Sequence, residues 1–311
     1  MLKKVKKHAL NKIYDFKDDL KGYKLVEASL GHNGEICVLG VSEFPEYIDG
    51  MFPPSKTKEK FNYKVIIKTP NEKKELVIKD QPWNYHFVQP IDQGNILLVC
   101  ARSYFHDENN YDHNARVFDK NGNLIRTFLL GDGIQNLLVT KGNKIWTGYF
   151  DEGVFGNYGW DKPVGANGLR AWDADGKELY KYPNRGDHFI DDCYALNVVS
   201  DDEILFYFYS DFELGRYSKG KIEYYKPDVE GSDGFIIFDE YILFRGGYNK
   251  RDKYILYNLK PINRLKRTGY LSFIDEQNTG IRADSVNCRG SLMLLQQGTS
   301  LYLANLKDLI N

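Results

Sequence analysis

Carboxylates recur at equivalent places along this 311-residue chain, directly before apolar stretches that we expect to form strands. If those strands are equivalent in a repeated fold, the carboxylates share one face, where each raises the pKa of the others unless a cation lies among them. A calcium ion prefers about 6 to 8 oxygen ligands, which such a group would supply in part. The alternative is that each Asp only opens a turn by accepting a hydrogen bond from a nearby amide. The residues are Asp18, Asp19, Asp80, Asp132, Asp191, Asp192, Asp233 and Asp284.

A histidine near one of these acidic pairs is a candidate general base. His188 follows Asp187 and comes shortly before Asp191 and Asp192. A carboxylate neighbour can fix the tautomer of an imidazole and raise its pKa, which suits proton transfer near neutral pH. The sequence contains no nucleophile elbow, phosphate-binding loop or HExxH motif, so serine nucleophile chemistry has no local support.

Long loops are expected at residues 42–62, 102–114 and 150–167, each after the second strand of a repeat. Loops beyond about 12 to 15 residues in a compact domain tend to be functional. The third loop alternates aromatics, glycines and acids, and such residues offer flat contact surface and close backbone approach to a ligand. A structural loop folded over its own aromatics is the alternative. We predict that ligands bind to the third loop and to the ends of the strands beside it. The predicted ligand-binding residues are Tyr149, Asp151, Glu152, Tyr158, Trp160, Asp192 and Asp211.

An internal repeat indicates the elements that must position these residues. Residues 134–151 match residues 194–211, each with an apolar strand, a polar turn and an aromatic-rich strand that ends at an Asp. The hairpin at 117–128 likewise matches 171–182, and each contains an Asn-Gly or Asp-Gly turn preceded by a turn-capping aspartate, Asp119 or Asp173. A module of four short strands that recurs every ~40 to 60 residues is typical of a β-propeller.

The strand pattern predicts an all-β protein with a single β-propeller domain over residues 1–311. Six four-stranded blades account best for the strands, although five or seven are possible. Residues 12–16 are expected to pair into the last blade and close the ring, because an open edge would leave unpaired backbone groups. The expected blades span residues 17–79, 80–130, 131–183, 184–226, 227–273 and 274–311.

Charge and composition limit the classes of partner. The 42 basic and 43 acidic residues are interspersed and give a net charge of −1, so no nucleic acid partner is expected. No apolar stretch is long enough to be a signal peptide or a membrane span, so we expect no membrane association. The four cysteines are widely spaced among apolar residues, which favours buried thiols and a cytoplasmic location over a disulfide framework.

The middle third of the chain resembles a family of uncharacterised bacterial β-propeller-like proteins. The resemblance rests on YFDEGVFGNYGW at 149–160 and on DDCYALN at 191–197, within a block that covers residues 131–212. It implies a bacterial propeller whose most distinctive part is the third long loop and the strand after it. That family has no established activity, so the resemblance assigns no catalytic residues.

Two functions at the channel mouth are therefore kept, and a third class, a protein-interaction scaffold on the blade rims, is favoured if Tyr and Phe side chains fill that mouth. The first is binding of a small polar or cationic ligand, or of a protein or peptide, at the channel mouth on the long-loop face. The alternative is a metal-dependent hydrolase, because calcium-dependent lactonases and esterases are six-bladed propellers that hold their metal at that place; this is an analogy of fold only. The candidate calcium ligands would be Asp132, Asp192, Asn197 and Asp284.

Overall fold

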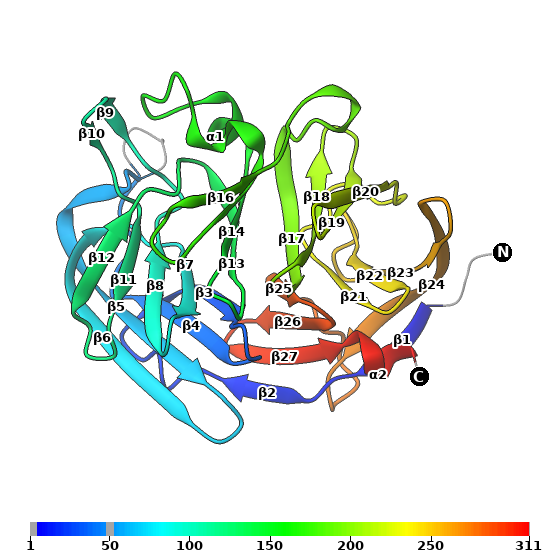
Figure 1. Ribbon diagram of the computed structural model, residues 1–311. Helices are drawn as coiled ribbons and strands as arrows, with labels where there is room; N and C mark the ends of the chain where they lie inside the picture. Colours follow the sequence, from blue (N-terminus) through cyan, green and yellow to red (C-terminus); the bar gives the residue numbers. More distant parts are fainter. Residues whose placement is uncertain (1–4, 48–52, 311) are drawn as a thin grey trace. The chain divides into compact units, whose positions relative to one another are not determined.

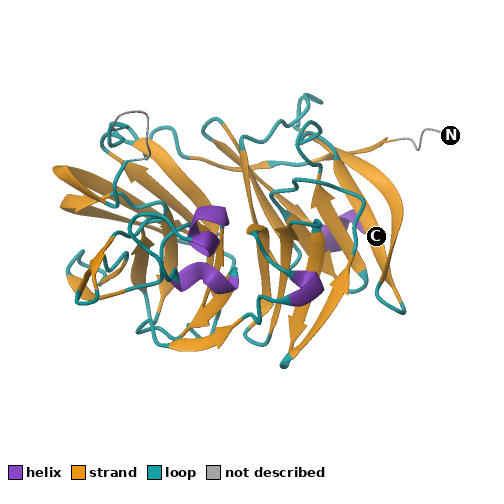
Figure 2. Ribbon diagram, turned by 90° about the horizontal axis from the view of Figure 1, so that it is seen from above, coloured by secondary structure: helices purple, strands orange, loops and turns teal. Residues whose placement is uncertain are grey.

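The computed structural model describes residues 5–47 and 53–310, and within them four-stranded sheets dominate while helices are short (Figures 1 and 2). Six sheets carry the four-stranded blade pattern, which confirms the predicted six-bladed β-propeller. The chain divides into two compact units. We call Leu20–Asp192 the middle unit, and Met1–Asp19 with Cys193–Asn311 the terminal unit. The single-domain organisation inferred from the sequence stays a prediction.

The middle unit contains three blades in chain order. The first has β3 (Lys24–Leu30), β4 (Ile36–Val41), β5 (Lys56–Lys68) and β6 (Lys73–Trp83). The second has β7 (Phe87–Ile91), β8 (Asn95–Val99), β11 (Ala115–Phe118) and β12 (Leu124–Phe128). The third has β13 (Ile134–Val139), β14 (Ile145–Tyr149), β15 (Leu169–Trp172) and β16 (Glu178–Lys181).

The terminal unit contains the other three blades. The fourth has β17 (Asp192–Ser200), β18 (Glu203–Tyr209), β19 (Glu213–Ser218) and β20 (Lys221–Tyr225). The fifth has β21 (Phe235–Phe238), β22 (Tyr241–Arg245), β23 (Tyr254–Lys260) and β24 (Arg264–Ile274), and β1 (Val5–Ala9) adds to β24 as a parallel fifth strand. The last has β25 (Ser285–Arg289), β26 (Leu292–Gln297) and β27 (Ser300–Asn305), followed by α2 (Leu306–Ile310).

The predicted closing strand is confirmed. β2 (Lys12–Asp15) pairs antiparallel with β27 at the edge of the last blade, with Lys12 opposite Tyr302 and Asp15 opposite Ser300 (Figure 1). The sheet edge that β27 would otherwise expose is thereby covered.

Apolar side chains form a core between neighbouring blades. In the middle unit, Val65 and Leu98 belong to a cluster between the first two blades, and Val117 and Leu137 to one between the second and third. The terminal unit repeats this arrangement, for example with Tyr207 and Phe244. Second strands are buried on both faces, as β4 is over its whole length, whereas outer strands such as β16 are mostly exposed. Such a decrease in burial from the second strand to the outer strand is expected when sheets pack face to face.

The capped turns are also as predicted. Asp119 accepts hydrogen bonds from the amides of Asn121 and Asn123 through the same oxygen, both at 2.8 Å, and Gly122 has φ 84°. Asp173 does the same at its own turn. A third such turn, at Asp275, was not predicted, because the residue at positive φ there is Asn278 rather than a glycine. These side chains fix the turn geometry that sets strand register.

The long loops contain more structure than the sequence indicated. β5 begins at Lys56, so the first loop is shorter than expected, and its residues 48–52 lie outside the described part. The second loop contains the hairpin β9 (Phe105–Asp107) and β10 (Asn110–Tyr111). The third contains α1 (Asp151–Phe155) and the 3-10 turn η1 (Val164–Asn167), and η2 (Gly186–His188) follows later. All helical segments in residues 5–47 and 53–310 are far too short to span a lipid bilayer.

Candidate functional site

A buried arginine organises the loops at one end of the middle unit. Nε and Nη2 of Arg102 donate to the two carboxylate oxygens of Asp132 at 2.9 and 2.8 Å, and Nη1 donates to Glu152 at 2.5 Å. The Ser103 amide also donates to Asp132, at 2.8 Å. The Arg102 and Asp132 side chains are only 5% and 1% exposed. This Arg102 network (Arg102, Ser103, Asp132, Glu152) joins the second blade to the third through a bidentate ion pair.

The charge state of the network follows from these bonds. Burial by itself lowers the pKa of Arg102, but the hydrogen bonds and charges of Asp132 and Glu152 outweigh it and raise that pKa above its usual value. Arg102 is therefore always a cation. Its positive charge is matched within the protein, so the network is a support and not an open site.

Aromatic rings cover the guanidinium of Arg102. The Tyr158 ring lies 4.0 Å from its Cζ and the Phe150 ring 5.3 Å, both in cation–π geometry. Figure 1 shows α1 and the β9–β10 hairpin at this same end of the middle unit. The third loop is thus held down over the arginine.

Trp160 attaches the third loop to the β9–β10 hairpin and to the residue Ser103 just before it. Its Nε1 donates to the Ser103 carbonyl at 2.7 Å, and its ring packs on Phe105 with centroids 4.9 Å apart. Gly159 has φ 85°, and a Cβ there would lie 2.2 Å from the Phe105 carbonyl oxygen, so only glycine fits. The loop therefore follows the structural alternative along much of its length: its aromatics fold over one another.

At this end Asp151 and Phe155 are exposed, and Phe189, Asp191 and Asp192 are half-buried. We define these five residues as the acidic–aromatic patch. Phe155 is 61% exposed, and its ring stacks on Phe189 with centroids 6.3 Å apart and planes at 21°. Burial, together with the smaller effect of the negative charges of Asp151 and Asp191, raises the pKa of Asp192 to about 6. The carboxylates are thus close enough to repel one another beside an open aromatic surface. Such a surface suits a cation, which carboxylates and ring faces both attract.

The predicted ligand-binding residues separate into surface and interior. Asp151 and Asp192 lie in the patch, while Glu152 and Tyr158 contact Arg102. Tyr149 departs from expectation, because it is fully buried and its hydroxyl donates to the Leu130 carbonyl, so no ring surface is open to a ligand.

Trp160 is also buried, as described above. Asp211 belongs to the terminal unit, where its backbone carbonyl and its carboxylate both contact Lys226. The candidate base His188 is half-buried in η2, just before the patch, and Asp187 beside it is exposed. Its role as a base stays a prediction.

Three of the four candidate calcium ligands are engaged in other bonds, and the fourth, Asp192, lies in the patch. Asp132 pairs with Arg102. Asn197 donates to the carbonyls of Phe235 and Gly290 at 2.8 and 3.1 Å and accepts from the Gly290 amide at 2.6 Å. Asp284 accepts from the Gly298 amide at 2.8 Å. Within the described residues, no three His, Cys, Asp or Glu side chains are grouped so as to hold a metal ion.

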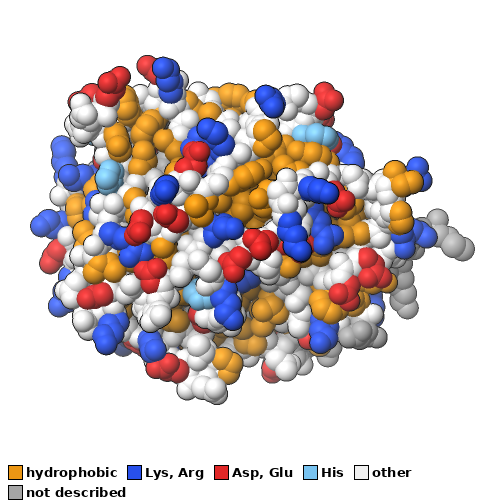
Figure 3. All heavy atoms as spheres, in the orientation of Figure 1, with side chains coloured by type: hydrophobic (Ala, Val, Ile, Leu, Met, Phe, Trp, Pro, Cys, Tyr) orange, Lys and Arg blue, Asp and Glu red, His pale blue; other side chains and the backbone are white. Residues whose placement is uncertain are grey.

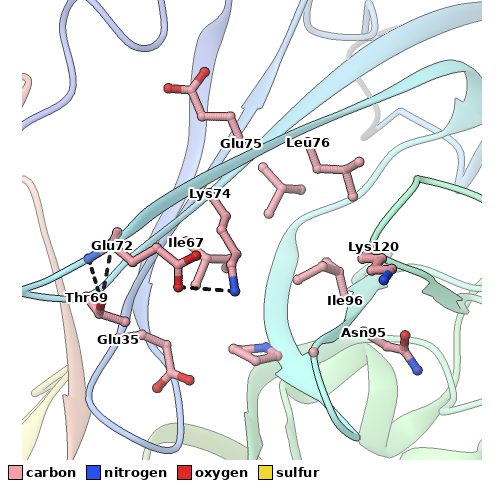
Figure 4. Close-up of a pocket in the computed structure, with 13 residues that line it drawn as sticks. Glu35, Ile67, Thr69, Glu72, Lys74, Glu75, Leu76, Asn95, Ile96 and Lys120 are labelled. Carbon is pink, nitrogen blue, oxygen red and sulfur yellow. Dashed lines mark hydrogen bonds and ion pairs between the residues drawn. The ribbon is translucent and has the colours of Figure 1, made fainter.

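An apolar hollow of about 230 Å³ lies at the opposite end of β8 from Arg102. Leu76 and Ile96 face one another across it, with Glu35 and Lys120 on opposite sides (Figure 4). Its rim holds Glu72 paired with Lys74 at 3.2 Å. Because the rim carries both signs of charge, the hollow favours no ligand charge.

Charged side chains are interspersed over the face of the molecule drawn in Figure 3, with no extended area of one sign. Individual pockets and patches therefore have to supply any charge selectivity.

Sequence reasoning missed Arg102, because its partner Asp132 is 30 residues away and on another blade. The available signal was an arginine just after the second strand of one blade combined with an aspartate just before the first strand of the next. To pair Arg102 with Asp132 from the sequence, one would have to predict how the strands of neighbouring blades align.

Solved structures similar to this chain show the fold alone. One is a streptogramin B lyase, with 13% identity, 86% of this chain and 98% of that chain covered, and a TM-score of 0.43. Another is the β-propeller domain of Cps50 (Swd1) from Myceliophteria thermophila, with 10% identity, coverage of 92% and 86%, and a TM-score of 0.49. A third is YCF48 bound to D1 peptide, with 10% identity, coverage of 91% and 79%, and a TM-score of 0.48.

No family model matches the chain, and the search of curated proteins gives no match either. The sheet order defines the class: this is a β-propeller. Any finer assignment depends on the chemistry of the surfaces described above.

Proposed function

We propose that the acidic–aromatic patch of the middle unit binds a cationic group, either an amine ligand or a lysine or arginine side chain of a peptide or protein. The observation that carries this proposal is the raised pKa of Asp192, about 6, beside two further carboxylates and the stacked pair Phe155 and Phe189. Carboxylates that repel one another in the free protein gain favourable interactions when a cation enters.

The neighbouring Arg102 network supports this role by holding the patch in place. α1 begins at Asp151, and Glu152 in its first turn is bound to the buried Arg102. Binding groups carried on a rigid support lose less conformational entropy when a partner arrives. The absence of a nucleic acid partner stays a prediction.

The metal-dependent hydrolase has no specific observation in its favour, since three of its four candidate ligands are bound to other protein groups. Bacterial origin and the family resemblance stay predictions. The cysteines are buried thiols, in keeping with the cytoplasmic location inferred from the sequence.

The test is fluorescence anisotropy with labelled peptides of equal length, rich in lysine, arginine or glutamate. We expect the basic peptides to bind and the acidic one not to bind. Asp151→Asn combined with Asp192→Asn should weaken binding at least about tenfold, and Phe155→Ser about fivefold, because charge and ring surface both contribute.

Asp161→Asn is the matched control, because Asp161 is an exposed carboxylate in the same loop. Affinity should also fall as the pH drops below about 6, where Asp192 becomes protonated and loses its charge. Equal binding of acidic and basic peptides, or an Asp161→Asn loss as large as that of the double variant, contradicts the proposal.

A further inference from the structure

A cavity of about 340 Å³ in the terminal unit is lined mainly by arginines. Its wall is formed by Arg245, Arg251, Asp252, Arg282 and Ala283. These residues come from the end of β22, from the connection to β23, and from the segment before β25. The cavity is therefore built by the fifth and last blades. It is distant in sequence from the acidic–aromatic patch, and its charge is of the opposite sign.

Arg245 is held rigidly at the inner wall. Its side chain is 2% exposed, its Nη1 donates to Asp233 at 3.0 Å and its Nε to the Arg251 carbonyl at 3.2 Å. Nη2 donates to the Ala283 carbonyl. A guanidinium has five N–H groups in a fixed planar fork, so two remain for another acceptor.

The remaining charges leave the cavity positive. Arg251 is 48% exposed and lies 3.4 Å from the same Asp233 oxygen that Arg245 binds. Arg282 is exposed, and its side chain has no ion-pair partner among the described residues. The lining thus holds three guanidinium groups and one carboxylate, Asp252. With Asp233, the ion-pair partner of Arg245 and Arg251, counted as well, one positive charge is in excess.

Two buried polar atoms next to Arg245 have no hydrogen-bond partner in the described part of the chain. They are Oδ1 of Asp233 and the hydroxyl of Tyr254. Tyr254 is fully buried, and its hydroxyl is near enough to Arg245 and Asp233 to feel their charges. Buried polar atoms are nearly always paired. The Tyr254 hydroxyl can donate to an anion, whereas the Asp233 oxygen only accepts and therefore needs a water molecule or another donor.

We propose that this cavity binds a small organic oxyanion, through a carboxylate or phosphate group placed between Arg245 and Arg282. The fork of Arg245 supplies oriented N–H donors, and Arg282 supplies an uncompensated charge at the entrance. The volume exceeds that of a bare phosphate and falls in the range of small-molecule sites, which begins near 300 Å³. A second hollow shares Asp252 and Arg282 and is lined by Lys7, so an organic body that extends from the anion also meets positive charge.

The test is isothermal titration calorimetry of the full chain in Tris chloride at fixed ionic strength. Glycerol 3-phosphate is the phosphate probe, succinate the carboxylate probe, and glycerol the neutral control. We expect saturable binding of at least one anion and none of glycerol. The stronger probe identifies which anionic group the cavity prefers.

Arg282→Ala should weaken that binding at least about tenfold. The protein should remain folded, because the side chain is exposed. Arg264→Ala is the matched control: Arg264 is an exposed arginine of β24 in the same unit and should change affinity less than about twofold.

Binding of neither anion overturns the proposal, as does an Arg264→Ala effect equal to that of Arg282→Ala. Arg245 is left intact in these variants, since its removal would leave Asp233 without its closest cation.

Discussion

The two units contain buried arginine–aspartate pairs of the same composition in different surroundings. In both, the aspartate and a glycine directly precede the first strand of a blade, at Asp132 before β13 and Asp233 before β21. Asp132 is 1% exposed and its arginine is covered by Tyr158, whereas Asp233 is 31% exposed and its arginine lines a cavity. An arginine–aspartate pair can therefore serve either as a structural support or as part of a binding cavity. Which of the two it does depends on the groups that cover the arginine.

The largest effect should come from breaking the closed pair. Arg102→Ala leaves the Asp132 carboxylate buried without a cation, which should lower the free energy of unfolding by about 3–5 kcal/mol. Urea denaturation measures this. Arg102→Lys should recover only part of the loss, because an ammonium cannot make the bidentate contact. A loss below about 1 kcal/mol for Arg102→Ala would show that the network does not support the loops.

The two aspartates should respond unequally to the same change. Asp132→Asn removes a charge from a dry bidentate pair and should cost about 3 kcal/mol. Asp233→Asn should cost about 1–2 kcal/mol, because water reaches that side chain and Arg251 shares it. Thermal unfolding of the two variants side by side provides the comparison, and equal losses would remove the distinction drawn between the pairs.

The Tyr158 ring that covers Arg102 should contribute measurably to the free energy of unfolding. Tyr158→Leu removes the ring that lies 4.0 Å from the Arg102 guanidinium and should cost about 1–2 kcal/mol. Tyr158→Phe keeps the ring and is the matched control, with an expected change under about 0.5 kcal/mol. A similar loss in both variants would assign the effect to the hydroxyl and not to the ring.

Removing a negative charge from the acidic–aromatic patch should leave the stability of the protein unchanged or increase it. The pKa of Asp192 in the folded protein, about 6, is above its value of 3.8 without burial, so the folded state holds the proton more tightly. Stability from this group is therefore present below pH 4 and is lost as the pH rises to about 6. Asp192→Asn should be more stable than the parent at pH 7 by about 1 kcal/mol, and the difference should disappear at pH 4. Denaturation at both pH values is the measurement, and lower stability of the variant at pH 7 would contradict it.

The smallest effect should be at the entrance of the arginine cavity. Arg282→Ala should change the free energy of unfolding by less than about 0.5 kcal/mol, since an exposed side chain without an ion-pair partner in the described part of the chain contributes little. Thermal unfolding in chloride buffer measures this. A loss as large as that of Asp233→Asn would place Arg282 among the structural arginines.

The fold could be predicted from the sequence because its signals are local. The hairpin predicted at 117–128 overlaps β11 and β12, and the apolar strand predicted at the start of 134–151 is β13. The turn capped by Asp119 depends on atoms within four residues. The short hairpin β9–β10 and the strand β1 were missed because they are too short or too polar to carry such a pattern.

The site could be predicted only in part because its contacts are not local. Asp132 was expected to be a metal ligand, since a carboxylate before a strand gives no sign of an arginine on the previous blade. Asp151 and Asp192 were identified as candidates, yet the half-buried ring of Phe189, on which Phe155 stacks, was not. The arginine cavity joins residues from the connections before β23 and β25, which no spacing in the sequence relates.

The pairing of β2 with β27 also sets an order of events when the chain is made. Asp15 and Ser300 hydrogen-bond across 285 residues, so β2 has no partner until β27 has been synthesised. At roughly 5–20 residues per second this interval is on the order of 15–60 s. Every residue of the middle unit has emerged well before the interval ends. In the cell, the middle unit can therefore fold first, while the waiting strand exposes an unpaired edge that a chaperone or a second nascent chain can reach.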